Sequence, residues 1–188
     1  MSDNPLDQAR GREDEWLVVR CQLGERPAFD DLITRWHPPL WKYARRLTGS
    51  DDAASDAVQE VWLRVLRGIN RLREASRFRP WLFGIARRVL MDRLRAQYAA
   101  PVVAEIDEEA IGSIELVDPA ADDLDLLNEE LERLSAIERD VLTLFYLQEL
   151  SLAEIADVMS VPIGTVKSRL FRARNLLKRE MDARRKHL

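Results

Sequence analysis

The stretch from Ser151 to Arg179 constrains the fold most, because its pattern predicts two helices joined by a tight turn. Ser151 and Glu154 have the S-x-x-E spacing of a capping box, which favours the start of a helix. Pro162 suits the first turn of a second helix. Between these two points, apolar residues recur at helical spacing: Leu152, Ile155, Ala156 and Met159.

The second of these helices is expected to have one apolar face and one basic face. The apolar stripe consists of Val166, Leu170, Ala173 and Leu177. The opposite side carries basic and polar side chains and one aromatic: Lys167, Ser168, Phe171, Arg172, Asn175, Lys178 and Arg179. In the major groove, Arg and Lys reach guanine edges and Phe packs on thymine methyl groups. The pattern therefore favours a DNA-binding helix-turn-helix; a solvated face of an ordinary helical hairpin is the alternative.

Charge is segregated along the chain, which the net charge of −4 conceals. Residues 160–188 carry nine basic and two acidic side chains, and residues 29–98 carry fourteen basic and eight acidic ones. Residues 99–126 carry nine acidic side chains and no basic one. Two basic segments separated by an acidic one indicate two polyanion-binding modules on one chain.

Membrane spans, internal disulfides and metal clusters have no signature in the sequence. No run approaches the roughly 18 apolar residues of a membrane span, and the acidic N-terminal segment lacks the form of a signal peptide. Cys21 is the single cysteine, and neither His37 nor His187 has ligand-like spacing around it. We therefore expect a cytoplasmic protein with no membrane insertion, no metal, no cofactor and no catalytic residues.

Helical periodicity without strand-like alternation predicts an all-α fold. In the N-terminal part we expect disorder over residues 1–11, then a short helix over residues 13–23. A second helix is expected over residues 29–47, with a break at Pro38 and Pro39.

A helix predicted over residues 51–70 has a polar side that includes one leucine. Its core side consists of Val58, Val61, Trp62, Val65 and Ile69. Its other side presents Asp56, Gln59, Glu60, Leu63, Arg64 and Arg67. An apolar residue ringed by charge is typical of a protein–protein contact. A single surface leucine is also common, so periodicity alone leaves both interpretations open.

The segment from Ile69 to Pro80 reads as a basic loop, and Pro80 is expected to open the next helix. The loop holds four arginines and Phe78. The core side of the following helix consists of Leu82, Ile85, Ala86, Val89 and Leu90, and the outer side of Gly84, Arg87, Arg88, Met91 and Arg95. A basic loop with an aromatic residue, leading into a basic helix, suits single-stranded nucleic acid. The alternative is a solvated arginine-rich face.

Residues 101–123 are acidic, contain two prolines and lack a sustained period, so we expect an extended linker. Periodicity returns from Leu124 to Gln148, where two helices are predicted. Ser135 and Glu138 repeat the capping-box spacing. These helices are expected to pack as the scaffold of the helix-turn-helix.

Three segments in this order resemble the extracytoplasmic-function (ECF) group of bacterial RNA polymerase sigma factors in the sigma-70 family. They are WKYARRLTGSDDAASDAVQEVWLRVLR, FRPWLFGIARRVLMDRLR and LSLAEIADVMSVPIGTVKSRLFRARNLL. The resemblance implies two small helical domains, a region 2 bundle and a region 4 helix-turn-helix. The expected division is an N-terminal extension (1–28), region 2 (29–98), an acidic linker (99–123) and region 4 (124–188).

The resemblance implies three binding surfaces. The first would bind the clamp helices of the polymerase's largest subunit through Asp56, Gln59, Glu60, Leu63 and Arg67. The second would open the minus-ten promoter element and capture a flipped base through Arg73, Ser76, Arg77, Phe78, Arg87, Arg88, Met91 and Arg95. The third would read the minus-thirty-five element through Lys167, Ser168, Phe171 and Arg172, with Thr165, Arg169 and Arg174 on phosphates.

The function so implied is that of a transcription initiation subunit without its own catalytic site. Its expected partners are core RNA polymerase (clamp helices and flap), promoter DNA in double-stranded and melted form, and an anti-sigma protein. The linker would thread through the polymerase's RNA exit path.

Three other functions stay open on the sequence. A DNA-binding regulator could carry a similar TVKSRL helix, but it needs a ligand or phospho-acceptor domain, usually with strands, which the first half does not predict. A small helical enzyme lacks a phosphate loop or a nucleophile–base pair here. A structural adaptor would leave both basic faces unexplained.

Overall fold

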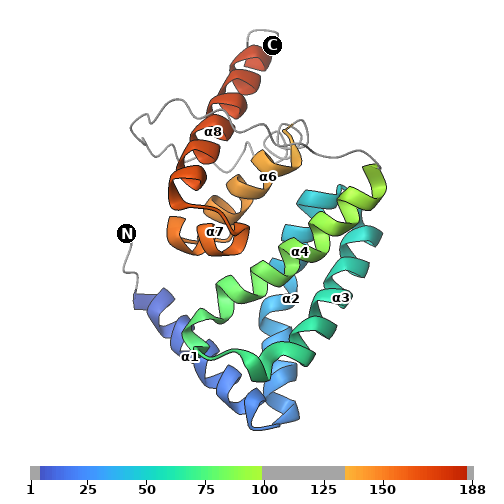
Figure 1. Ribbon diagram of the computed structural model, residues 1–188, viewed down its shortest axis with the longest axis vertical. Helices are drawn as coiled ribbons and strands as arrows, with labels where there is room; N and C mark the ends of the chain where they lie inside the picture. Colours follow the sequence, from blue (N-terminus) through green and yellow to red (C-terminus); the bar gives the residue numbers. More distant parts are fainter. Residues whose placement is uncertain (1–4, 99–133, 186–188) are drawn as a thin grey trace.

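The computed structural model describes residues 5–98 and 134–185, and every regular element in these ranges is helical. The first range contains α1 (Pro5–Gln22), α2 (Arg26–Thr48), α3 (Asp51–Gly68) and α4 (Phe78–Tyr98), which we call the N-terminal unit. The second contains α6 (Ala136–Leu142), a π-helical turn (Thr143–Leu147), α7 (Leu152–Met159) and α8 (Ile163–Arg185), the C-terminal unit (Figure 1). The expected all-α fold with two helical units is confirmed.

Local signals place the boundary between α2 and α3. Gly49 adopts a φ of 69°, a left-handed conformation that favours glycine, and its N–H donates to the Arg45 carbonyl to close α2. Ser50 then caps α3 by accepting a hydrogen bond from the N–H of Ala53. This tight connection makes α2 and α3 antiparallel neighbours, and the core residues predicted for α3 are all buried.

Aromatic rings fill the core of the N-terminal unit. Tyr43 of α2 lies edge-on to Phe83 of α4, with ring centroids 5.4 Å apart. Trp36 contacts both Phe78 and Phe83, at 6.2 and 6.1 Å. These contacts fix α4 across α2. Phe83 belongs to the core, although the core side predicted for α4 did not include it.

Two helices of this unit are longer than expected. α1 begins at Pro5, so the predictions of disorder over residues 5–11 and of a helix start at residue 13 were wrong, while residues 1–4 lie outside the described residues. α2 runs through Pro38 and Pro39 without a break. Each proline removes a backbone hydrogen bond. Buried residues on both sides of the pair, among them Leu32 and Leu40, hold the helix to the core.

The segment predicted as a basic loop contains two short 3-10 turns, Ile69–Arg71 and Ala75–Arg77. α4 begins at Phe78, two residues before the predicted start. Pro80 therefore lies in the first turn of α4, where a helix does not need its missing N–H. All five core positions predicted for α4 are buried.

In the C-terminal unit both capping boxes are confirmed, at Ser135 with Glu138 and at Ser151 with Glu154. Ser160 ends α7 in a left-handed conformation, with a φ of 55°. Pro162 precedes α8 instead of lying within it, and its carbonyl accepts the N–H groups of Thr165 and Val166. The predicted apolar stripe of α8 is buried, except that Leu177 is only partly so.

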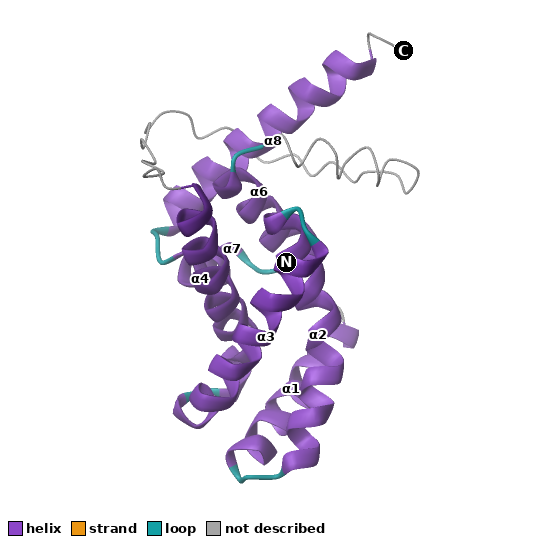
Figure 2. Cartoon of the chain, turned by 90° about the vertical axis from the view of Figure 1, so that its right-hand side faces the viewer, coloured by secondary structure: helices purple, strands orange, loops and turns teal. Residues whose placement is uncertain are grey.

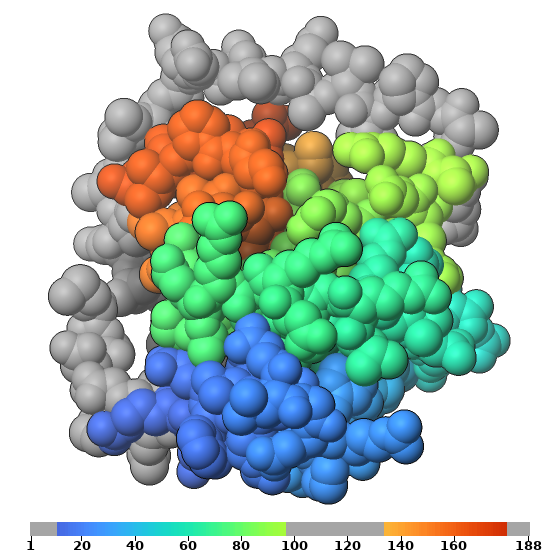
Figure 3. Space-filling view, turned by 60° about the horizontal axis from the view of Figure 1, so that its bottom comes forward, coloured from blue at the N-terminus to red at the C-terminus, as the bar shows by residue number. Residues whose placement is uncertain are grey.

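The two units pack against each other along α4. α7 lies across α4, and α6 contacts α2 (Figures 1 and 2). In the space-filling view the C-terminal unit adjoins the start of α4 directly (Figure 3). The face of α4 predicted to point outward is therefore partly covered, and Gly84 on it is buried. The predicted linker, and the predicted helical residues 124–133, lie outside the described residues.

Candidate nucleic-acid and protein interfaces

An apolar groove lies between α2 and α3, with Leu63 on its wall. Leu63 is 49% exposed and Leu66, one helical turn further, is 55% exposed. The groove has a volume of about 430 Å³, and its lining includes Ile33 and Trp41 of α2. Exposed apolar surface of this kind is typical of a protein-binding site. Sequence reasoning missed Leu66, although its i, i+3 spacing from Leu63 was a usable signal.

Polar and charged residues lie beside this groove on α3. Asp56, Gln59 and Arg67 are exposed, as expected for residues available to a partner. Glu60 instead accepts a hydrogen bond from Arg93 of α4 at 2.9 Å. That bond, together with nearby Arg64, holds the pKa of Glu60 below its ordinary value. Glu60 is thus engaged within the unit.

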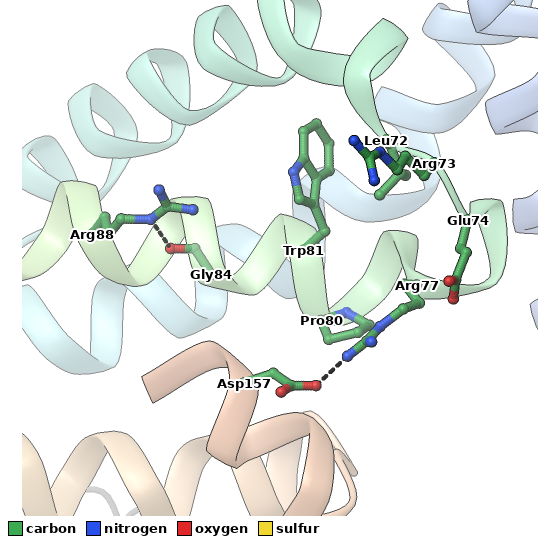
Figure 4. Close-up of a pocket in the computed structure, with 9 residues that line it drawn as sticks. All are labelled: Leu72, Arg73, Glu74, Arg77, Pro80, Trp81, Gly84, Arg88 and Asp157. Carbon is green, nitrogen blue, oxygen red and sulfur yellow. Dashed lines mark hydrogen bonds and ion pairs between the residues drawn. The ribbon is translucent and has the colours of Figure 1, made fainter. Parts of the chain in front are cut away.

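A basic cavity of about 400 Å³ lies where the 3-10 turns lead into α4 (Figure 4). Three arginines and two acidic residues line it, together with Trp81 and small or apolar residues: Arg73, Arg77, Arg88, Glu74, Asp157, Leu72, Pro80 and Gly84. A side chain at Gly84 would meet no atom within 4 Å, so the cavity leaves room beside this part of the helix although Gly84 itself is buried. Ser76, also predicted to bind DNA, is exposed nearby. The cavity brings together cations and a ring in the way that single-stranded nucleic acid requires.

Phe78 does not belong to this surface. Its side chain is 1% exposed and packs on Trp36 and Trp81 in the core. A ring so enclosed offers no face to a nucleic-acid base. We therefore withdraw Phe78 from the DNA-binding residues; Trp81, which lines the cavity, is the aromatic residue that the sequence reasoning missed.

Arg87 makes an ion pair across the boundary between the units. Its Nε donates to an Oδ of Asp140 at 2.7 Å, and the hydroxyl of Tyr43 donates to the other Oδ at 2.7 Å. Asp140 is fully buried. Burial raises the pKa of Asp140, while Arg87 acts in the opposite direction. Burial likewise raises the pKa of Tyr43 well above its ordinary value.

Sequence reasoning identified neither Asp140 nor Tyr43 as a polar contact. The available signal was an aspartate next to the apolar run that begins at Val141. Of the other residues predicted on this face of α4, Met91 is partly buried. Arg95 is exposed and lies 3.4 Å from Asp92 on the same helix.

The basic face of α8 is largely open. Lys167 is exposed, and the Arg172 side chain is 66% exposed while it lies 3.1 Å from Glu138 of α6. Thr165, Ser168 and Phe171 are partly buried, so Phe171 is less exposed than its predicted place on the basic face suggested. Lys167 and Arg172 are therefore accessible on α8, the second helix of the helix-turn-helix. This is the geometry of a helix that reads bases in the major groove.

Two arginines predicted to bind phosphates, Arg174 and Arg169, contact other parts of the protein. Arg174 places its guanidinium over the rings of Phe145 and Tyr146, 5.3 and 5.2 Å from their centroids. Arg169 lies near Arg87 and Asp140, and burial lowers its pKa. Cation–π packing and interdomain burial account for these positions, and phosphate contacts by either residue stay predictions.

The N-terminal helix supports the basic loop. The side-chain amide of Gln22 donates to the carbonyls of Ile69 and Leu72, at 2.9 and 2.8 Å. Asp14 accepts a hydrogen bond from Trp36, which in turn packs on Phe78. Helix α1 thus holds both ends of the loop, a role for which the sequence offered no signal.

Two further kinds of site have no candidate in the part of the chain that the structure describes. No cluster of three or more His, Cys, Asp or Glu side chains is placed to hold a metal ion. No described helix is both long enough and apolar enough to span a bilayer.

Comparison with known proteins matches both units to one family. Residues 32–99 match the family model for Sigma-70 region 2, and residues 124–177 match that for Sigma-70, region 4. The chain is 32% identical over 181 residues to the ECF RNA polymerase sigma-E factor of Haemophilus influenzae, which covers 90% of this chain and 95% of that relative. It is 34% identical over 179 residues to the ECF RNA polymerase sigma-E factor of Escherichia coli strain K12, with 87% and 92% covered.

A solved structure shares the arrangement of the helices. The sigma factor RpoE from Bartonella quintana, in its co-crystal structure with the anti-sigma factor NepR, has a TM-score of 0.65 and 28% identity. The similarity covers 82% of this chain and 96% of that one. Together with the two relatives, it shows that the chain belongs to the ECF group of RNA polymerase sigma factors in the sigma-70 family.

Proposed function

We propose that this sigma factor binds core RNA polymerase through the groove between α2 and α3, and that its two basic surfaces contact two promoter elements. The observation that carries the proposal is the presence of both surfaces on separate units of one chain. The basic cavity and α4 suit a melted strand, and the open face of α8 suits duplex DNA.

The groove is proposed as the polymerase-binding site because its leucines are exposed beside free polar groups. Leu63 and Leu66 supply apolar area at the centre, and Asp56, Gln59 and Arg67 supply a polar rim. This division between centre and rim is typical of a protein interface. The clamp helices of the largest subunit are the proposed partner.

Opening of the minus-ten element would draw on binding energy alone. Each base that stacks on an aromatic side chain contributes about 1–3 kcal/mol, which is comparable with the cost of unpairing and unstacking it. Trp81 and the arginines around it are the proposed receptors. No nucleotide hydrolysis or covalent step by this chain is required.

The minus-thirty-five element would be read by the exposed side chains of α8. Lys167 and Arg172 are the proposed base contacts, with Ser168 and Phe171 beside them. An anti-sigma protein is a further proposed partner, because a structural relative was crystallised with one. A stand-alone DNA-binding regulator is the competing function, favoured only by the open face of α8.

Run-off transcription with core RNA polymerase and a library of promoter fragments tests the proposal. We expect specific initiation only when this protein is present, and its loss in Leu63→Asp. Leu23→Asp is the matched control, since Leu23 is 74% exposed but is not among the residues that line the groove. Sequence-specific DNA binding without any effect on initiation would favour the regulator instead.

A further inference from the structure

One arginine of α4 is bound to the helix that carries the proposed polymerase-binding residues. Arg93 donates to one carboxylate oxygen of Glu60 from Nε at 3.2 Å and from Nη2 at 2.9 Å. Its Nη2 also donates to the backbone carbonyl of Asp56 at 3.2 Å, one helical turn earlier on α3. Arg93 is therefore attached to α3 at two points, the side chain of one residue and the backbone of another.

Both oxygens of the Glu60 carboxylate are paired within the chain. The second oxygen accepts a hydrogen bond from Arg64 of the same helix at 2.6 Å. The hydrogen bond from Arg93 is the largest of the effects that lower the pKa of Glu60. A partner protein that paired with Glu60 would have to displace one of these two arginines.

The buried part of α4 ends before Arg93. Leu90 is the last buried residue of α4 among those whose burial the structure describes. Beyond it, Met91 and Leu94 are partly buried and Arg95 is exposed. The apolar core therefore holds the end of α4 less firmly than its start, and the contacts of Arg93 with α3 add to what holds it.

The directions of α3 and α4 bring these partners together. The two helices lie side by side and run antiparallel, so that the end of α4 lies beside the first half of α3 (Figure 1). Both belong to the N-terminal unit, and their contact does not depend on the placement of the C-terminal unit. An isolated surface ion pair contributes little, whereas several charges that share one network can contribute more. Glu60 with its two arginines is such a network.

We propose that Arg93 is a positioning residue for promoter opening. It holds the end of α4, with Met91 and Arg95, at a fixed place on α3, and Glu60 serves as its acceptor instead of binding polymerase. The assignment rests on the proposed function, in which α4 contacts a melted strand. It divides the acidic residues of α3 by role, since the Asp56 carboxylate stays available to polymerase while Glu60 acts within the chain.

Charge reversal separates the two roles. Arg93→Glu and Glu60→Arg each replace attraction by repulsion, and the double variant restores an ion pair together with the net charge of the parent chain. Such a cycle isolates the interaction between the two side chains. Side-chain exposure is 39% at Arg93 and 35% at Glu60, so neither reversal is expected to prevent folding.

Two controls match the reversals in charge. Asp56→Arg makes the same change as Glu60→Arg one helical turn away, at a carboxylate proposed to meet polymerase. Arg26→Glu makes the same change as Arg93→Glu at an exposed residue of α2. When Asp56→Arg is combined with Arg93→Glu, we expect no recovery, since the contact of Arg93 is with the backbone of Asp56.

The first measurement is made on the free chain. Hydrogen–deuterium exchange followed by mass spectrometry reports how often the amides from Met91 to Arg95 open. We expect each reversal to speed their exchange about three- to tenfold, and the double variant to return most of the way to the parent rate. Arg26→Glu should leave the exchange within about twofold of the parent. Unchanged exchange in both reversals would overturn the positioning role.

The second measurement uses core RNA polymerase. Fluorescence anisotropy of the labelled chain gives its affinity for the core enzyme, and permanganate footprinting gives the opening of a promoter fragment that the parent chain selects from the library. We expect Glu60→Arg to keep the core affinity within about twofold but to reduce opening about tenfold, with most of the opening recovered in the double variant. Asp56→Arg should instead weaken core binding several-fold.

Loss of core affinity in Glu60→Arg, without recovery in the double variant, would overturn the proposal, because Glu60 would then bind polymerase directly. Recovery of the exchange rate without recovery of opening would overturn the role in promoter opening. If circular dichroism shows that a reversal loses helix content, Glu60→Gln and Arg93→Gln, which only remove the charges, take its place. Failure of the proposed function is distinguishable, because the parent chain would then start no transcription with core polymerase while the exchange results would stand.

Discussion

The two basic surfaces differ in what holds their arginines. On α8, the Arg172 side chain is 66% exposed and its carboxylate neighbour, Glu138, belongs to the same unit. On α4, the Arg87 side chain is 18% exposed and its partner, Asp140, belongs to the other unit. Both surfaces were identified from the same kind of basic helical stripe. A stripe thus predicts which face binds polyanions, but not whether that face is open in the free chain.

The largest expected effects come from removing one arginine from each surface. Arg172→Ala should weaken duplex promoter binding, because one good base contact contributes about 1–3 kcal/mol of discrimination. Arg88→Ala should leave duplex binding by the free chain unchanged and reduce promoter opening in the polymerase complex. Gel-shift assays and permanganate footprinting measure the two effects. Equal loss of free-chain duplex binding in both variants would show that the surfaces are not separate.

The support of the basic loop by α1 gives the next effect. Gln22→Met keeps the length of the side chain but removes two hydrogen bonds, each with a contribution of about 0.5–1.5 kcal/mol. We expect reduced promoter opening with unchanged duplex binding through α8. Gln22→Lys should restore opening, since an ammonium group can donate to the same carbonyls. A loss of stability without any change in opening would limit Gln22 to a structural role.

The burial of Asp140 predicts that the free energy of unfolding depends on pH in a way that a solvated carboxylate would not produce. Its pKa is raised above 3.8 by burial, so the folded chain keeps the proton where the unfolded chain has released it. Its contribution to the free energy of unfolding is therefore largest below pH 3.8 and falls as the pH rises through the raised value. Asp140→Asn should lack this slope, which for one proton is at most about 1.4 kcal/mol per pH unit. Denaturant unfolding at several pH values would measure the difference.

A parent chain and an Asp140→Asn variant with the same pH dependence would contradict that expectation. Asp140 would then be solvated, and the surface of α4 would be as open as that of α8.

The smallest effect concerns the turn that orients α8. Ser160 has a φ of 55°, which costs an ordinary residue about 1–2 kcal/mol. Glycine adopts this left-handed conformation at a lower cost, so Ser160→Gly should raise the free energy of unfolding by about 0.5–1 kcal/mol. Ser160→Ala keeps the strained backbone and serves as the control in thermal unfolding. Equal melting temperatures for the two variants would exclude strain at this turn.

Helical elements and their core faces could be predicted from the sequence because they depend on local spacing. Both capping boxes and the buried stripes of α3 and α4 followed from residues three and four positions apart. The start of α1 and the continuity of α2 through Pro38 could not be predicted in this way, since tertiary packing overrides local signals there. The exposure of Leu63 was predicted correctly, while its groove needed residues from α2.

Interactions between distant parts of the chain were not predictable. Asp140 lies 53 positions after Arg87, and Asp157 lies 80 positions after Arg77. Phe78 was assigned to DNA because aromatic residues in basic loops suit that role, but the position of Trp36 encloses it in the core. Gln22 acts on carbonyls 47 and 50 positions away. No periodic pattern contains such pairings.

The central comparison is tested most directly by measuring DNA binding with and without core RNA polymerase. Duplex and single-stranded promoter fragments are titrated with the free chain and with its polymerase complex. We expect the free chain to bind the duplex through α8 but the single strand only weakly, and the complex to bind the single strand in a manner that depends on Arg88. Tight single-strand binding by the free chain, unchanged by polymerase, would contradict the account.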